Sequence, residues 1–428
     1  MTLFIRNAAL VTMDGRPQVI PKASIRIDDS HITEVSSAQR APRGAEVIEG
    51  EGMVALPGLV NAHTHAAMTL LRGVADDMPL LPWLKRRIWP VEMKLTGDDV
   101  YWGAMLASAE MLRGGVTTFN DMYHFFEATA QAVADSGIRA NLSGVLLGFL
   151  PDAPERLEKA IEFGRQWHRG ADGRVVTMLG PHAPYTCPVP LLERVVAGAC
   201  SLGIGLHVHL SETAQEVAES KQKHGLTPIE LMDRLGMFNC RPVLAAHCVH
   251  LSDNDIAILK RRRVGVSHNP GSNMKLASGI SPVPRLLREK VTVGLGTDGA
   301  ASNNNLDLLE EARLAALLHK AHTNDPTVVT ASQALWMATR GGAQALGLGN
   351  EIGKIAPGMR ADIILVDLRQ PHLWPPHSLI SHLVYAARAG DVHTVIVNGK
   401  VVVRARELTA LDLPKVMRET KARAERLI

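Results

Sequence analysis

The strongest constraint on the fold is an alternation in the middle of the chain between short apolar runs and longer amphipathic segments. Eight runs have the length and residue types of buried strands, and stretches with helical spacing of apolar residues lie between them. Eight strand–helix units favour a closed (β/α)8 TIM-like barrel of the α/β class. An open, doubly wound sheet is the alternative. The runs are residues 55–62, 116–120, 138–147, 175–179, 205–210, 243–247, 264–268 and 291–296.

The two ends of the chain have a different pattern, in which short β-prone runs are separated by turn residues. Near the C-terminus, Asn398-Gly399 is a strong hairpin signal between two β-branched runs. We expect residues 1–55 and 351–428 to form one small β-sandwich domain beside a metal-dependent barrel of residues 56–350. An amphipathic helix near residues 413–427 should close the chain.

Composition argues against several classes of function. A net charge of +3 over 428 residues gives no electrostatic case for nucleic acid or an acidic membrane. No run of about 18 apolar residues predicts a membrane span, and the N-terminus lacks the apolar core of a signal peptide. The four cysteines form no C-x-x-C pair, so we expect reduced thiols in a cytoplasmic protein. They are Cys187, Cys200, Cys240 and Cys248.

Polar residues stand at or just beyond the ends of four predicted strands, where a barrel of this kind has its active site. Two imidazoles spaced i and i+2 on a strand point the same way and can bind one ion. Three histidines with one carboxylate suit zinc, although ferrous iron and manganese accept the same ligands. The predicted metal ligands are His63, His65, His209 and Asp298.

Three neighbouring residues have predicted roles around that ion. His207 shares a strand face with His209 but lies farther from the strand end, so we expect it in the core or behind the ligands. Glu212 follows in HLSE, where a carboxylate can take a proton from an activated water and return it to the leaving group. His247 could polarise that water or bind the metal, and we favour the first role.

With these residues in place, the whole chain resembles the 5'-methylthioadenosine/S-adenosylhomocysteine deaminases of the amidohydrolase superfamily. The segments PGLVNAHTHAAMTLLRG, DDMPLLPWL, GPHAPYTC, HVHLSET, SHNPGSNMKLASG and GLGTDGAASNNNLD carry the resemblance. It implies hydrolytic removal of the adenine 6-amino group, which gives an inosine analogue and ammonia. Relatives with two metals have a bridging lysine on the fourth strand. The run 175–179 has none, which favours a single divalent ion, most simply zinc.

The resemblance also implies substrate-binding residues. Glu212 matches a proton shuttle that contacts the purine, with Asp298 beside it. Glu92, in WPVEM, matches a carboxylate that holds the ribose hydroxyls, and a carboxylate can accept from two hydroxyls at once. His182, in GPHAPYT, matches a histidine that contacts substrate, and Trp83 resembles a residue that covers the nucleoside.

The stretch after the third run departs from relatives that accept S-adenosylhomocysteine. Those relatives have arginines there for the amino-acid carboxylate, whereas this chain is apolar as far as Glu155-Arg156. We therefore expect a preference for methylthioadenosine, although Arg72, Arg86 or Arg87 could supply a charge.

Some alternatives remain open at this point. Guanine, other purines and s-triazines are the targets of relatives with the same metal site, and a non-catalytic scaffold is a remote possibility that the retained ligands oppose. The partner is expected to be a small-molecule nucleoside, and the superfamily suggests a homo-oligomer. The Pro-rich loop 78–93 is a candidate lid.

Overall fold

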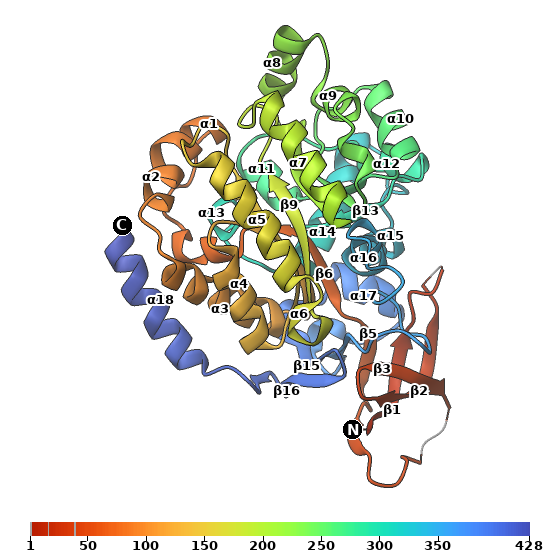
Figure 1. Ribbon diagram of the computed structural model, residues 1–428. Coiled ribbons are helices and arrows are strands. Elements are labelled where there is room, and N and C mark those ends of the chain that lie inside the picture. Colours follow the sequence, from red (N-terminus) through yellow and green to blue (C-terminus); the bar gives the residue numbers. More distant parts are fainter. Residues whose placement is uncertain (1, 16, 38–39) are drawn as a thin grey trace.

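The computed structural model describes residues 2–15, 17–37 and 40–428 and contains a barrel of eight parallel strands with helices outside it (Figure 1). Neighbouring barrel strands pair in the order in which they occur in the chain, from β6 to β13. The strands are β6 (Leu59–Thr64), β7 (Val116–Tyr123), β8 (Arg139–Leu146), β9 (Val175–Pro181), β10 (Gly205–Leu210), β11 (Val243–His247), β12 (Gly265–His268) and β13 (Val293–Leu295).

The first and last barrel strands meet at the mouth. The backbone N–H of Asp298, just beyond β13, donates to the carbonyl of His63 at 3.0 Å. The Asn61 side chain accepts from the N–H of Thr297 at 3.0 Å and donates to its hydroxyl at 2.8 Å. The barrel expected from the strand–helix repeats is therefore confirmed, and the open sheet is not.

Long helices follow most barrel strands and begin and end where capping chemistry predicts. The box formed by Thr96 and Asp99 starts α3, for example, and Gly137 in the left-handed region ends α4. From α3 onward, the α-helices between the barrel strands are α3 (Gly97–Arg113), α4 (Phe126–Ser136), α5 (Ala153–Trp167), α6 (Gly170–Gly173), α7 (Val189–Leu202), α8 (Ala214–His224), α9 (Pro228–Arg234), α10 (Asp253–Arg262), α11 (Pro270–Lys275) and α12 (Val283–Arg288). After β13 come α13 (Ala300–Asn303), α14 (Leu308–Thr323), α15 (Ala331–Trp336), α16 (Gly342–Ala345) and α17 (Leu379–Tyr385).

A second sheet combines strands from both ends of the chain, as expected, and encloses an apolar core of its own. Strand β5 lies parallel to β1 and antiparallel to β14, so the N-terminal and C-terminal segments are joined inside the sheet. The domain bounds at residues 55 and 350 remain predictions. The strands are β1 (Thr2–Val11), β2 (Val19–Asp28), β3 (His31–Ser36), β4 (Glu46–Glu49), β5 (Met53–Pro57), β14 (Ile363–Asp367), β15 (Val392–Val397), β16 (Lys400–Arg404) and β17 (Glu407–Leu408).

The run 55–62, predicted to be one barrel strand, is in fact two strands in two different sheets. Strand β5 ends at Pro57 and β6 begins at Leu59, and between them Gly58 donates its N–H to the carbonyl of Asp362 at 2.9 Å. A Cβ at Gly58 would lie 2.1 Å from Oγ1 of Thr117. The chain can therefore pass from one sheet to the other here only without a side chain. Residues 55–62 are apolar almost throughout, so the sequence pattern gives no sign that the chain changes sheet here.

Two further expectations need correction. Cys200, in α7, and Cys240, which follows β10 and α9, form a disulfide with Cα atoms 5.2 Å apart, so the four cysteines are not all reduced. The proposed loop 78–93 is largely helical: α1 (Leu80–Trp83), η2 (Leu84–Ile88) and α2 (Trp89–Glu92) follow one another directly. Pro90 lacks an N–H for the usual i−4 bond, which accounts for the widened turn before it.

The last helix, α18 (Leu413–Leu427), matches its predicted range and runs along the outside of the molecule (Figure 1). Arg423 and Arg426 pair with Asp98 and Asp99 at the start of α3. Leu427 packs into the same apolar cluster as Trp83. Among the described helices, none has both the length and the apolar character that crossing a bilayer requires.

Candidate active site

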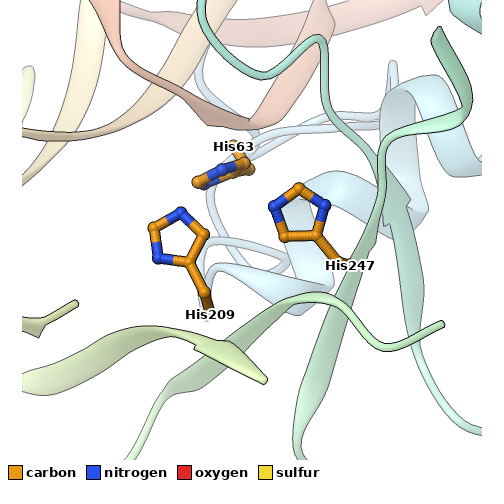
Figure 2. Close-up of side chains that lie close together, drawn as sticks. All are labelled: His63, His209 and His247. Atoms are coloured by element: carbon orange, nitrogen blue, oxygen red, sulfur yellow. The ribbon is translucent and has the colours of Figure 1, made fainter. Parts of the chain in front are cut away.

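Three histidine rings and one aspartate converge at the carboxyl end of the barrel. Nε2 of His63 and Nε2 of His65 each lie 3.3 Å from Oδ1 of Asp298. The ring of His209 lies 4.9 Å from that of His63, centre to centre. Figure 2 shows His63, His209 and His247 facing a common point from three separate strands. Residues far apart in sequence thus surround one small space.

The spacing of these atoms fits a single metal ion. Bonds of about 2.0–2.2 Å at a tetrahedral angle place neighbouring ligand atoms roughly 3.3–3.6 Å apart. His63, His65 and Asp298 offer ligand atoms within 4.8 Å of one another, and so do His63, His209 and His247. Nε2 of His63 is buried and has no hydrogen-bond partner among the described residues. That unsatisfied atom is what a cation between these side chains would explain.

Hydrogen bonds behind the rings fix which nitrogen faces the ion. Nδ1 of His65 donates to the carbonyl of Met122 at 2.6 Å, and Nδ1 of His209 donates to the carbonyl of His182 at 2.8 Å. In a neutral imidazole this leaves the Nε2 lone pair free to bind metal. Burial lowers the pKa of His63 to about 4 and that of His209 well below its usual value, so these rings are neutral.

His207 lies behind His63 in the barrel interior. Its Nε2 is 2.8 Å from Nδ1 of His63, and its Nδ1 is 3.2 Å from the hydroxyl of Ser143. This contact leaves Nε2 of His63 pointing at the proposed ion. His207 therefore holds a neighbouring ring, and its own nitrogens are engaged away from the centre of the site.

Asp298 is held as a carboxylate by its surroundings. Burial alone would raise its pKa, but His63, His65 and His247 outweigh that effect and hold the pKa well below its usual range. Its Oδ2 accepts from the Ser272 hydroxyl at 2.6 Å, and its Oδ1 accepts from the N–H of Gly299 at 2.8 Å. Its backbone has a φ of 60°, in the left-handed region.

Glu212 and His247 face each other beside the cluster. Their nearest side-chain atoms, Oε2 and Nε2, are 3.9 Å apart. Oε1 of Glu212 also accepts from the Ser278 hydroxyl at 3.2 Å, and burial raises the pKa of Glu212 above its usual value. Nδ1 of His247 contacts Oδ1 of Asn273 at 2.8 Å, which fixes the ring orientation. The pair can bind and move a proton next to the proposed ion.

The predicted substrate residues line the same pocket as the metal cluster. The Glu92 side chain, at the end of α2, is 7% exposed, and burial raises its pKa to about 7. His182 contacts the Thr186 hydroxyl through Nδ1 at 2.9 Å, and burial lowers its pKa to about 3. The Trp83 indole N–H donates to the carbonyl of Ala75 at 3.0 Å, and Trp83 is one of the residues that line the pocket.

Several pocket residues escape prediction from the sequence. Tyr123 and His124 line the pocket beside Glu92, and Nε2 of His124 lies 3.9 Å from Oε2 of Glu92. Strand β7 continues through Tyr123, three residues beyond its predicted end, so these side chains reach the mouth. Tyr185 also lines the pocket. In the sequence, the aromatic residues that follow Asp121 were the signal that could have predicted these pocket residues.

A second hollow adjoins this pocket on the side of Glu92. Trp89, Glu92, His124 and Leu147 line both. The outer hollow adds mostly apolar residues and one arginine, which pairs with Asp152 at 2.9 Å. These added residues are Met93, Leu95, Phe125, Phe149, Leu150 and Arg156. The cavity therefore extends past Glu92 in a direction away from the metal cluster.

Comparisons with known proteins agree with this geometry. Residues 54–402 match the model of the amidohydrolase family. The chain is 52% identical over 429 residues to a 5-methylthioadenosine/S-adenosylhomocysteine deaminase of Pelotomaculum thermopropionicum, covering 100% of this chain and 99% of the relative. An adenosine deaminase from Xanthomonas campestris, solved with bound zinc, superposes with a TM-score of 0.95 at 39% identity, covering 99% and 98% of the two chains. A zinc complex of atrazine chlorohydrolase from Arthrobacter aurescens TC1 gives 0.92 at 27% identity, covering 99% and 100%.

Proposed function

The chain belongs to the amidohydrolase family, and from that premise we propose that it is a metal-dependent deaminase of adenine nucleosides. The proposed reaction removes the 6-amino group of 5'-methylthioadenosine, of S-adenosylhomocysteine, or of both, and gives the inosine analogue and ammonia. The full-length similarity to a protein named for these two substrates supports the proposal, as does the structural similarity to an adenosine deaminase.

One observation favours a nucleoside over a free base. A single pocket contains the metal cluster at one side and the buried carboxylate of Glu92 at another. Glu92 has no arginine or lysine partner among the described residues, and its polar neighbours are Tyr123 and Nε2 of His124, which lies 3.9 Å from its Oε2. Two carboxylate oxygens have more lone pairs than these neighbours use, so the carboxylate can also accept from ribose hydroxyls. Guanine and the triazines have no ribose, so this buried carboxylate would gain no additional hydrogen-bond donor in their complexes.

We propose that His63, His65, His209 and Asp298 hold one divalent ion, most simply zinc. When bound, that ion supplies a water acidified toward a pKa of about 7. Glu212 accepts the proton of the attacking water and delivers it to N1 of the purine, and then helps to protonate the departing ammonia. His247 and Asp298 orient the attacking oxygen, and His182 and Trp83 contact the nucleoside.

Ammonia release across a substrate panel tests the proposed function. We expect turnover of methylthioadenosine, S-adenosylhomocysteine or adenosine at kcat/KM values about 100-fold or more above those for guanine and melamine, because a site built to bind hydroxyls discriminates against ligands that lack them. Absorbance spectra that shift from adenine to hypoxanthine identify the product. Turnover of guanine or a triazine alone would contradict the nucleoside assignment.

The outer hollow bears on the 5' substituent. Its apolar residues suit a methylthio group, which supports the expected preference for methylthioadenosine. Arg156 also lines it, however, and a guanidinium there could meet the carboxylate of S-adenosylhomocysteine. Relative kcat/KM for the two nucleosides decides the matter, and a clear preference for S-adenosylhomocysteine would refute the expected preference.

Replacing Glu92 with glutamine should raise KM for the nucleoside roughly 10- to 100-fold, because hydrogen bonds to a charged group contribute about 1.5–3 kcal/mol. The pKa of Glu92 is raised to about 7, so the carboxylate form that accepts from the ribose appears as pH rises through 7. In the wild type, KM should therefore fall between pH 6 and 8. Steady-state kinetics should show this fall absent in Glu92→Gln; an unchanged KM would contradict the role.

We also propose that the protein works in the cytoplasm as a homo-oligomer. The free, buried thiols of Cys187 and Cys248 support a reducing compartment, whereas the Cys200–Cys240 disulfide does not. Exposed Met93, Phe125 and Phe149 at the outer hollow are consistent with contact between copies. Light scattering at several protein concentrations would measure the assembly.

A further inference from the structure

Glu216, in the first turn of α8, makes an unusual set of hydrogen bonds. Its Oε1 accepts from the backbone N–H of Ser211 at 3.0 Å, and its Oε2 accepts from the backbone N–H of Glu212 at 2.7 Å. Both donors precede the helix, whose N-cap is Thr213. One carboxylate therefore holds two successive peptide groups, and one of them belongs to the proposed proton shuttle.

Other helices in this chain show what a carboxylate at the same position usually does. In α9 and α10, the third helical residue accepts from the N–H of the N-cap itself: Glu230 from Thr227 at 2.9 Å, and Asp255 from Ser252 at 2.8 Å. That arrangement is the ordinary capping box. Glu216 instead reaches past Thr213 to the turn before it, so its hydrogen bonds secure the turn.

The secured turn joins two parts of the catalytic pocket. Ser211 has a φ of 53°, which bends the chain directly after β10 and sends Glu212 toward His247. The carbonyl of Ser211 accepts the N–H groups of Val249, at 3.0 Å, and His250, at 2.9 Å, in the loop that follows His247. A left-handed conformation at a serine costs energy and persists only where its surroundings enforce it. The hydrogen bonds to the Glu216 carboxylate stabilise this conformation of Ser211.

Glu216 is a buried carboxylate, and burying a charged group to stabilise a turn is energetically unfavourable. The residue is 5% exposed, and no arginine or lysine pairs with it in the described parts of the chain. A buried carboxylate without a cation is unfavourable unless its hydrogen bonds compensate. Two backbone donors provide that compensation here, and Glu216 is not among the residues that line the substrate pocket.

We propose that Glu216 is a positioning residue for deamination: by binding the N–H groups of Ser211 and Glu212, it fixes the backbone from which the Glu212 carboxylate reaches the reacting atoms. The inference rests on the proposed function of Glu212, and it concerns geometry that can be measured without substrate. Glu216 itself is proposed to touch neither substrate nor metal.

Glu216→Gln tests the proposal, because the amide replaces one acceptor oxygen with a donor that opposes a backbone N–H. We expect kcat to fall about 10- to 100-fold through displacement of Glu212. KM and bound metal should change less than about twofold, because the lost geometry matters chiefly in the transition state. Asp255→Asn is the matched control: it alters a buried carboxylate at the same helical position in α10 and should leave kcat unchanged. Equal losses in both variants would overturn the proposal.

A double-mutant cycle separates positioning from a general loss of structure. If Glu216 acts through Glu212, adding Glu216→Gln to Glu212→Gln should lower the residual kcat by less than twofold. A further loss as large as in the single variant would refute the proposal.

Hydrogen exchange distinguishes a failure of the proposed positioning role of Glu216 from a failure of the proposed deaminase function. In Glu216→Gln, but not in Asp255→Asn, the peptide covering residues 210–213 should exchange faster than in the wild type. Unchanged exchange there would overturn the inference even if deamination is confirmed. Faster exchange in Glu216→Gln, together with no nucleoside turnover by the wild type, would instead reject the proposed function. It would still support the role of Glu216 in fixing the backbone of the turn.

Discussion

Glu212→Gln should lower kcat by about a hundredfold to ten-thousandfold, the range in which a positioned acid–base group contributes. Glutamine preserves the size of the side chain and can still accept from the Ser278 hydroxyl, but it cannot take a proton from the attacking water. Metal content and KM should stay near those of the wild type. Elemental analysis and steady-state kinetics on the same preparation measure all three quantities.

The control for this variant is Glu219→Gln. Glu219 lies on the exposed face of α8, where it accepts from Gln215 at 2.7 Å, and its replacement should leave kcat unchanged. Near-normal turnover in Glu212→Gln with its metal intact would show that another group moves the proton.

The acidic limb of the rate profile gives a second signature of Glu212. Burial raises its pKa, so its carboxylate becomes protonated at a higher pH than an ordinary glutamate would. Because the protonated form cannot accept the water's proton, kcat should fall as pH drops through this raised pKa. The limb should be missing from the residual rate of Glu212→Gln.

The sequence predicts the parts of this molecule that depend on repeated patterns and on position at strand ends. Buried parallel strands are nearly continuous apolar runs, which is why the predicted and observed strands coincide so closely at β10 and β11. The same property hides the break at Gly58, where one apolar run serves two sheets. Hydrophobicity reports burial, and it does not report which sheet a strand joins.

Features that depend on contacts distant in the chain could not be predicted in this way. Cys200 and Cys240 are 40 residues apart with no motif around them, and only the packing of α7 against the chain after α9 brings them together. Glu216 resembles a capping glutamate in the sequence, and its role follows from which backbone groups it reaches. Tyr123 and His124 could be recognised as pocket residues only once the observed end of β7, at Tyr123, was known.

His209→Ala should abolish stoichiometric metal binding and lower kcat/KM by at least a thousandfold. The substitution removes one of the four proposed ligands, and the remaining set of two imidazoles and a carboxylate matches a much weaker site. Prolonged dialysis of the wild type against a chelator should give the same loss of activity, which about one equivalent of zinc should reverse. Elemental analysis reads the metal directly.

His207→Gln is the sharpest comparison, because sequence parity alone does not separate His207 from His209. His207 contacts Nδ1 of His63 from behind, so its loss should weaken metal affinity about 10- to 100-fold while one ion per chain still binds at saturating zinc. Titration with a competing chelator measures both affinities. Saturable metal at one per chain in His209→Ala, together with none in His207→Gln, would reverse the two roles and redraw the ligand set. Binding in both variants with wild-type affinity would remove the histidine cluster as the metal site, and with it the basis for assigning deamination to this pocket.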